Sequence, residues 1–317
     1  MSPNAGAQSL QHNGAQASRP AAWSPAPAVW VSLWIHAVAL LAAASFPTTL
    51  PWVLAVLAGN HLVLGLAGLS PRSRLLGPNL ARLPERSVRR REVALTFDDG
   101  PDPRTTPHVL DLLDRYAAKA SFFCVGENAA AHTAIVREIV RRGHSVENHS
   151  HRHPHAFAFY GWGAMRREVE VAQSILGSIA GRSPRFFRAP MGLRNPLLDP
   201  VLARAGLRHV GWARRGCDGI SGDPAAVLSR LVRKLAAGDV LMLHDGRSAR
   251  TLAGQPVVLV VLPALLEQFA TRGLKAVSLP MAFDEEPHDC EPDNSRLVDD
   301  LPGSDPQPLA AAETCAS

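Results

Sequence analysis

The sequence predicts an α/β protein, a deformed (β/α) barrel with about seven strands, preceded by a two-helix transmembrane hairpin. Two observations predict the barrel. Short apolar runs alternate with amphipathic stretches between residues 92 and 280, and polar clusters follow successive runs at their C-terminal ends. A third observation, two long uncharged apolar stretches near the N-terminus, predicts the hairpin. An open doubly wound sheet is the alternative arrangement for the same alternation.

The N-terminal part divides into a polar lead and an apolar hairpin. Residues 1–28, rich in Ala, Ser, Pro, Gln and Asn, predict a disordered lead. Residues 29–69 hold two stretches of bilayer length without Asp, Glu, Lys or Arg, joined by PTTLP. Buried core helices are one alternative, although core helices usually have a polar face. A signal peptide is another, although only Arg19 precedes the first stretch. We therefore expect an integral membrane protein.

Charge is unevenly distributed along the chain. Residues 70–91 carry seven arginines and predict a basic linker, suited to the cytoplasmic side or to anionic lipid headgroups. Residues 281–317 predict an acidic, disordered tail, whose charge of −9 leaves +14 for the rest of the chain. Because no aromatic–basic interleaving accompanies the basic body, we expect a membrane as partner and no nucleic acid.

The alternating region contains seven predicted strands with helical patterns between them. Such alternation implies parallel strands joined by crossover helices. The C-terminal ends of parallel strands meet at one edge, so the polar clusters there are expected to form a site. The predicted strands are residues 92–97, 119–125, 144–148, 185–189, 208–213, 239–244 and 275–280.

Two of these clusters contain potential metal ligands. Asp98 and Asp99 follow the first strand, and a histidine-rich segment follows the third. One carboxylate and two imidazoles are a typical catalytic zinc set, which leaves a coordination position open. His149 and His153 would share a face of a helical turn, whereas both would share a face with His151 on an extended strand. Spacing alone therefore leaves the histidine pair open.

Four motifs together resemble a known family. TFDDGP at 96–101, NHSHRH at 148–153, FRAPMG at 187–192 and LMLHD at 241–245 occur in this order. They resemble the polysaccharide deacetylase family (carbohydrate esterase family 4) over residues 92–280. The resemblance implies a deformed (β/α) barrel and metal-dependent removal of N-acetyl groups from amino sugars.

The resemblance also implies roles for individual residues. A divalent metal, with zinc as the expected ion, would be held by Asp99, His149 and His153. Asp98 would be the general base, held ionised by Arg188. His244 would be the general acid, and Met191, where the family usually has Tyr, would offer its backbone N–H to the oxyanion.

One motif departs from the family pattern. The family often has Asp-x-x-Asp-Trp after the fifth strand, where this chain has Arg215-Gly216-Cys217-Asp218-Gly219. In the family the first Asp tunes the acid histidine. Whether Asp218 or another group orients His244 is therefore open, as is the role of Arg215.

The sequence thus predicts a membrane-anchored, metal-dependent hydrolase. Its substrate would be an acetylated amino-sugar glycan, either a polysaccharide or lipid-linked. A non-catalytic carbohydrate-binding or scaffold protein on the same fold is the alternative, although no proposed catalytic residue is missing. The sugar, the acyl group (acetyl, formyl or another), the oligomeric state and the side of the membrane stay open.

Overall fold

The computed structural model describes residues 23–284 of the 317-residue chain. Most of the predicted lead (1–28) and of the predicted acidic tail (281–317) lies outside the described residues. At the two boundaries, the first helix already begins at Pro27 and the last helix ends at Phe283.

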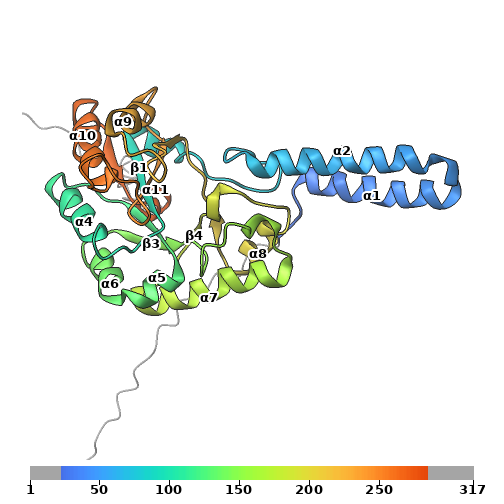
Figure 1. The fold of residues 1–317 in the computed structure, drawn as a ribbon, viewed down its shortest axis with the longest axis horizontal. Coiled ribbons are helices and arrows are strands. Elements are labelled where there is room, and N and C mark those ends of the chain that lie inside the picture. Colours follow the sequence, from blue (N-terminus) through green and yellow to red (C-terminus); the bar gives the residue numbers. More distant parts are fainter. Residues whose placement is uncertain (1–22, 285–317) are drawn as a thin grey trace, which may run out of the picture. The chain divides into compact units, whose positions relative to one another are not determined.

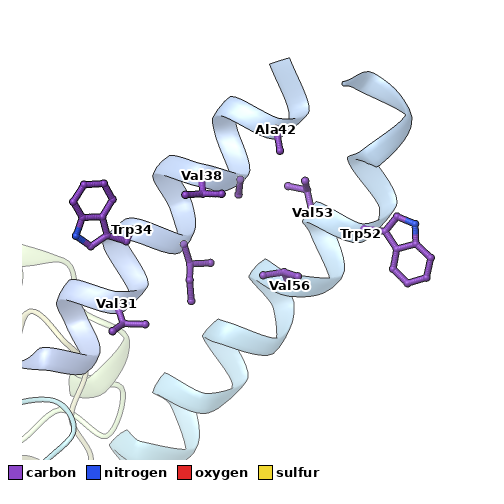
Figure 2. A pocket seen from close by; sticks show the side chains of 9 residues that line it. Val31, Trp34, Val38, Ala42, Trp52, Val53 and Val56 are labelled. Carbon is purple, nitrogen blue, oxygen red and sulfur yellow. The ribbon is translucent and has the colours of Figure 1, made fainter. Parts of the chain in front are cut away.

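Two antiparallel helices form the N-terminal hairpin, α1 (Pro27–Ser45) and α2 (Leu50–Leu69), joined by the short 3-10 helix η1 (Pro47–Thr49) (Figure 1). Proline stands in the first turn of each helix, where its missing N–H leaves no hydrogen bond unmade. Valine side chains point into the space between the helices, an apolar pocket of about 460 Å³ (Figure 2).

Polar side chains meet across the hairpin at one level. Asn60 Nδ2 donates to Ser32 Oγ at 2.8 Å, and the Nε2 atoms of His36 and His61 lie 3.3 Å apart. The Ser32 carbonyl also lies 2.7 Å from His36 Nδ1. Because an apolar sequence alone specifies pairing weakly, these contacts fix which residues of the two helices face one another.

The sheet consists of parallel strands in the order β5-β4-β3-β2-β1-β7-β6, with β8 pairing to β1 off this path. β8 pairs with the first half of β1, and β2 pairs with its second half. Consecutive strands are therefore neighbours from β1 to β5 and from β6 to β7, β1 also pairs with β7, and the ring is open between β5 and β6. This order confirms the deformed barrel and rules out a doubly wound sheet. The strands are β1 (Glu92–Asp98), β2 (Ser121–Cys124), β3 (Ser145–Asn148), β4 (Phe186–Phe187), β5 (Arg208–His209), β6 (Arg214–Arg215), β7 (Val240–His244) and β8 (Lys275–Val277).

Helices surround the strands on the outside (Figure 1). They are α3 (Glu85–Arg89), α4 (Thr106–Arg115), α5 (Gly126–Ala131), α6 (Thr133–Arg141), α7 (Trp162–Ala180), α8 (Leu198–Arg204), α9 (Pro224–Val232), α10 (Val257–Thr271) and α11 (Leu279–Phe283). The short 3-10 helices η2 (Phe157–Phe159) and η3 (Pro190–Gly192) lie in loops after β3 and β4.

Alternation along β1 decides which side chains enter the barrel. Val93, Leu95 and Phe97 belong to the large core shared with the surrounding helices, whereas Ala94 belongs to a separate inner cluster. The strand period of two places Thr96 and Asp98 on the inner face with Ala94. The strand therefore delivers Asp98 to the C-terminal end of the barrel interior.

The segment that connects the hairpin to β1 is built into the barrel wall. Leu80 pairs with Val210 just after β5, and Arg82 pairs with Asp239 just before β7. An ion pair of 2.6 Å between Arg82 and the fully buried Asp239 adds to the second contact. This part of the predicted basic linker thus spans from one side of the open barrel to the other.

Candidate active site

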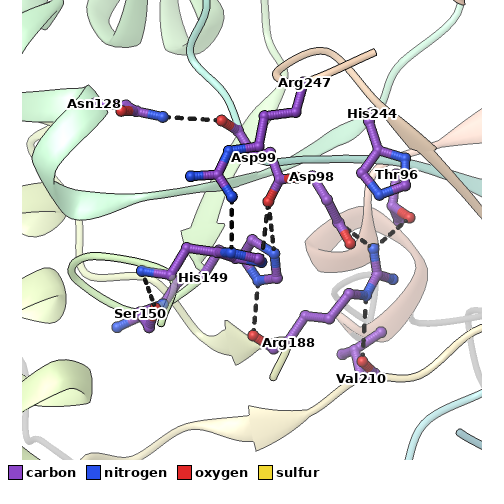
Figure 3. A network of polar contacts seen from close by, with 12 residues as sticks. Thr96, Asp98, Asp99, Asn128, His149, Ser150, Arg188, Val210, His244 and Arg247 are labelled. Carbon is purple, nitrogen blue, oxygen red and sulfur yellow. Dashed lines mark hydrogen bonds and ion pairs between the residues drawn. The ribbon is translucent and has the colours of Figure 1, made fainter. Parts of the chain in front are cut away.

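Two consecutive aspartates enter the site from the end of β1. Asp98 ends the strand, and Asp99 follows in the left-handed region with φ of 69°. That turn directs both buried carboxylates into the same region (Figure 3). Gly100 follows because a Cβ there would lie 2.3 Å from Asp245 Oδ2. Burial raises the pKa of Asp245 to about 7, so this neighbour adds less negative charge than an exposed carboxylate.

Asp99, His149 and His153 form a compact cluster with the donor set of a metal site. Asp99 Oδ1 lies 3.3 Å from His149 Nε2 and 3.2 Å from His153 Nε2, and all three potential ligand atoms lie within 4.8 Å of one another. All three residues are buried. Burial favours a raised pKa at Asp99, but His149 and then His153, when they are protonated, outweigh burial and hold that pKa below its ordinary value.

The hydrogen bonding of His149 fits a metal ligand. Its Nδ1 lies 2.8 Å from the backbone carbonyl of Arg188, which can only accept, so Nδ1 carries the proton. In the neutral ring the Nε2 lone pair then faces Asp99 Oδ1, a buried oxygen without a hydrogen-bond donor among residues 23–284. Converging lone pairs without a proton between them repel, and a cation relieves that repulsion. These residues therefore fit a divalent metal.

Asp98 is held by a fully buried arginine. Arg188 Nη1 donates to Asp98 Oδ1 at 2.5 Å and to Thr96 Oγ1 at 2.9 Å (Figure 3). Two backbone carbonyls accept from the remaining nitrogens, and the guanidinium lies 4.1 Å from the ring centroid of Phe123. Because every side of the guanidinium is occupied, the Asp98 carboxylate has a fixed orientation and a permanent counter-charge.

His244 enters from the end of β7 and is held by Asp218. Its Nδ1 donates to Asp218 Oδ1 at 2.9 Å, and its backbone N–H donates to Asp218 Oδ2 at 2.7 Å. Burial lowers the pKa of His244, but the hydrogen bond and charge of Asp218 outweigh burial and raise that pKa to about 9. The imidazole is therefore charged at neutral pH, with Nε2 as its free proton donor.

The opposite wall of the cavity comes from the loops after β4 and β5. Met191, half exposed with φ of 58°, lies beside Gly192 and Trp212. A Cβ on Gly192 would approach the Trp212 ring to 2.2 Å, so glycine permits this contact. The cavity holds about 50 Å³, close to the volume of one or two waters, so a sugar ring must stay at its mouth.

All eight residues proposed from the sequence gather here. Arg188 and Asp218 lie behind the cavity, while His151 stays outside the cluster, with its Nδ1 against Gly126. The cavity itself is lined by Asp98, Asp99, His149, His153, Met191 and His244, together with Ala189, Gly192, Trp212, Arg215 and Met242.

Two residues at the site were not expected from the sequence. Trp212 belongs to the apolar run 208–213, and its place at the C-terminal end of that run is the signal that could have identified it. Arg247 lies three residues beyond His244, and its Nη1 approaches His153 Nδ1 to 3.3 Å. No sequence pattern distinguishes Arg247 from other exposed arginines.

Sequence comparison finds deacetylases among the relatives of this chain. The polysaccharide deacetylase family model matches residues 85–210. The chain is 32% identical to a peptidoglycan-N-acetylglucosamine deacetylase of Bacillus cereus, over 61% of this chain and 68% of the relative. It is also 32% identical to a chitooligosaccharide deacetylase of Sinorhizobium fredii, over 59% of this chain and 90% of the relative.

Structural comparison agrees. A crystal structure of a peptidoglycan N-acetylglucosamine deacetylase superposes with a TM-score of 0.59 at 28% identity, covering 66% of this chain and 94% of that one. The family 4 carbohydrate esterase of Streptomyces lividans, solved with acetate, gives 0.53 at 32% identity over 58% and 91%. The chain therefore belongs to the polysaccharide deacetylases of carbohydrate esterase family 4, hydrolases that act on amide bonds.

Proposed function

We propose that this protein is a membrane-anchored, metal-dependent deacetylase of N-acetylated amino-sugar glycans. One observation carries the proposal. The Asp99, His149 and His153 cluster lies in one small cavity between a carboxylate with a fixed counter-charge and a charged imidazole. Amide hydrolysis needs a group that removes a proton from water and a group that gives a proton to the leaving amine.

The donor set of two imidazoles and one carboxylate suits zinc, which when bound polarises an amide carbonyl and lowers the pKa of water. Asp98 accepts the proton of the attacking water, and Arg188 orients Asp98 and supplies its counter-charge. His244 holds a proton on Nε2 and donates it to the departing amine nitrogen. The backbone N–H of Met191, a residue of the cavity wall, would donate to the oxygen on which negative charge develops.

Exposure of the hairpin supports the proposed anchoring. Only 11% of the most apolar window of each helix is buried, which is too little for core helices of a water-soluble protein. Large apolar side chains stand in the open, among them Trp34, Leu40 and Trp52, which are exposed by 67%, 74% and 77%. Apolar surface of this extent indicates a membrane or protein partner. A signal sequence remains the alternative for α1, because it lies near the N-terminus.

An apolar groove beside α2 favours a lipid-linked glycan as substrate. The groove, of about 430 Å³, lies between α2 and the loops that hold Phe159 and residues 193–196. Phe159 is 87% exposed, and Arg194 N–H donates to the Gly68 carbonyl at the end of α2. Since Leu193 directly follows Met191 and Gly192 of the cavity wall, a hydrocarbon chain in the groove would place its attached sugar near the cavity.

A non-catalytic scaffold is the second candidate. A family 4 pseudoenzyme of Bacillus anthracis matches with a TM-score of 0.58 at 19% identity, which shows the fold alone. Against a scaffold role, the proposed base, acid and metal ligands of this chain are all present and converge. Removal of a formyl or another small acyl group would use the same residues.

Acetate release by the full-length protein in detergent tests the proposal. We expect release from N-acetylated chitooligosaccharide or a lipid-linked N-acetylated sugar, with zinc restoring activity after chelation. Asp98→Asn should abolish release but keep zinc binding. Asp223→Asn is the matched control, because Asp223 caps α9 outside the cavity and Asn caps equally well. Absence of both release and zinc binding in the wild type would favour the scaffold.

A further inference from the structure

The short strand β6 consists of two arginines whose side chains point to opposite faces of the sheet. Arg214 Nε donates to the buried carboxylate of Asp239 at 2.8 Å, and its Nη2 donates to the backbone carbonyl of Lys234. Arg215, which points to the other face of the strand, lines the cavity that contains Asp98, Asp99 and His244. One arginine thus supports the barrel and the other faces the substrate.

Arg215 has no acidic partner within residues 23–284. Its Nε is buried without a hydrogen-bond acceptor, and its guanidinium lies 5.5 Å from the ring centroid of Trp212. The acids around the cavity already face other groups: Asp98 pairs with Arg188 and Asp218 with His244, while Asp99 lies against the histidine pair. A buried unpaired donor costs stability, so a guanidinium in this state is prepared for an acceptor from outside the chain.

A tuning role for Arg215 at His244 does not account for this arrangement. Asp218 already accepts from the side chain and the backbone of His244 through its two oxygens. A second cation beside the charged imidazole would oppose its protonation. Where the family pattern has an aspartate, this chain therefore presents a positive charge to whatever enters the cavity.

We propose that Arg215 recognises an oxyanion on the substrate, which makes the substrate an anionic amino sugar. This inference rests on the proposed deacetylase function and deepens it. The guanidinium offers paired N–H donors that match a carboxylate or a phosphate, and Trp212 limits its rotation. Because the sugar ring stays at the cavity mouth, the anion lies on the acylated sugar or on the group attached to it.

Two chemical sources could supply the oxyanion. One is a carboxylate carried by the sugar itself, and the other is a phosphate that links the sugar to a lipid. Both satisfy the same donors, so the two are separated by experiment. The probes are N-acetylglucosamine as the neutral reference, N-acetylmuramic acid as the carboxylate and N-acetylglucosamine 1-phosphate as the phosphate.

Binding to the metal-free full-length protein in detergent tests recognition without turnover. By calorimetry, we expect one anionic probe to bind at least about tenfold more tightly than the neutral sugar. Arg215→Gln should remove this preference, and Arg215→Lys should keep part of it. Arg233→Gln, the same charge change at an exposed residue outside the cavity, should leave the preference intact. Equal binding of all three probes to the wild type would overturn the proposal.

Turnover provides the second measurement. The ratio of kcat/KM for the lipid-phosphate-linked N-acetylated sugar or a carboxylate-bearing glycan to that for neutral chitooligosaccharide should fall about 10- to 100-fold in Arg215→Gln. An equal fall for all substrates would place Arg215 at the reaction centre and refute anion recognition. Release from the neutral substrate alone, without anion preference, would keep the deacetylase and reject this inference. If no substrate releases acetate but the wild type still prefers an anionic probe in binding, anion recognition by Arg215 is kept and the deacetylase function is rejected.

Discussion

Replacing Asp218 by Asn should move the alkaline limit of activity to lower pH. Asp218 is the strongest of the influences that raise the pKa of His244 to about 9, and burial opposes it. Without the carboxylate, that pKa should return to 6.5 or below. At pH 8 the fraction of protonated His244 would then fall from about 90% to about 3%, a roughly thirtyfold loss of general acid.

The assay is kcat/KM for acetate release between pH 6 and pH 10, with zinc saturating. We expect the alkaline limb to move down by about two to three pH units. A bound cation lowers the pKa of His244 in both proteins, so the difference between them is the quantity to compare. Asp223→Asn, on the same loop, should leave the limb in place. If the Asp218→Asn limb moves by less than about half a pH unit, Asp218 does not set the protonation of His244.

Three further predictions concern stability. Gly192→Ala should lower the free energy of unfolding by about 1–3 kcal/mol in urea titrations, because its Cβ meets Trp212; an unchanged midpoint would argue against that contact. Arg188→Met should lower the free energy of unfolding by about 3–5 kcal/mol by leaving Asp98 buried and unpaired, and adding Asp98→Asn should restore part of this loss. If Arg188→Met lowers the free energy of unfolding equally with and without Asp98→Asn, the pairing is contradicted. Zinc at 100 times its Kd should stabilise the wild type by about 2.7 kcal/mol in thermal unfolding, and a matching gain in Asp99→Ala would exclude Asp99 as a ligand.

The meeting of the C-terminal ends of parallel strands explains why much of the site could be predicted from the sequence. Parallel strands bring their C-terminal ends together, so residues directly after apolar runs, such as Asp98 and His244, were expected to meet. The same rule applies to Trp212. The strand β6 could not be predicted, because its two residues are both arginines and show no apolar alternation. Only its backbone pairing with β7 defines it as a strand.

The histidine pair meets for a reason that spacing could not provide. The loop after β3 is neither a helical turn nor an extended strand. Ser150 and His153 both take positive φ, at 66° and 53°, and the Ser150 hydroxyl accepts from the His153 N–H. These bends bring His153 back to His149 and leave His151 outside. Positive φ at residues other than glycine depends on tertiary contacts, which a single sequence does not show.

Residues 80–83 set the order in which the protein can be completed. They leave the ribosome well before Val210 and Asp239, the residues with which they pair. Asp239 comes 157 positions after its partner Arg82. Closing such long loops is entropically costly and slow. Residues 80–83 can therefore pair with the barrel only after most of the domain has been synthesised. On the proposed anchoring, the hairpin is by then inserted in the lipid. The enzyme would therefore complete its folding at the bilayer surface. The orientation of the cavity mouth relative to the bilayer would be set before the barrel is closed.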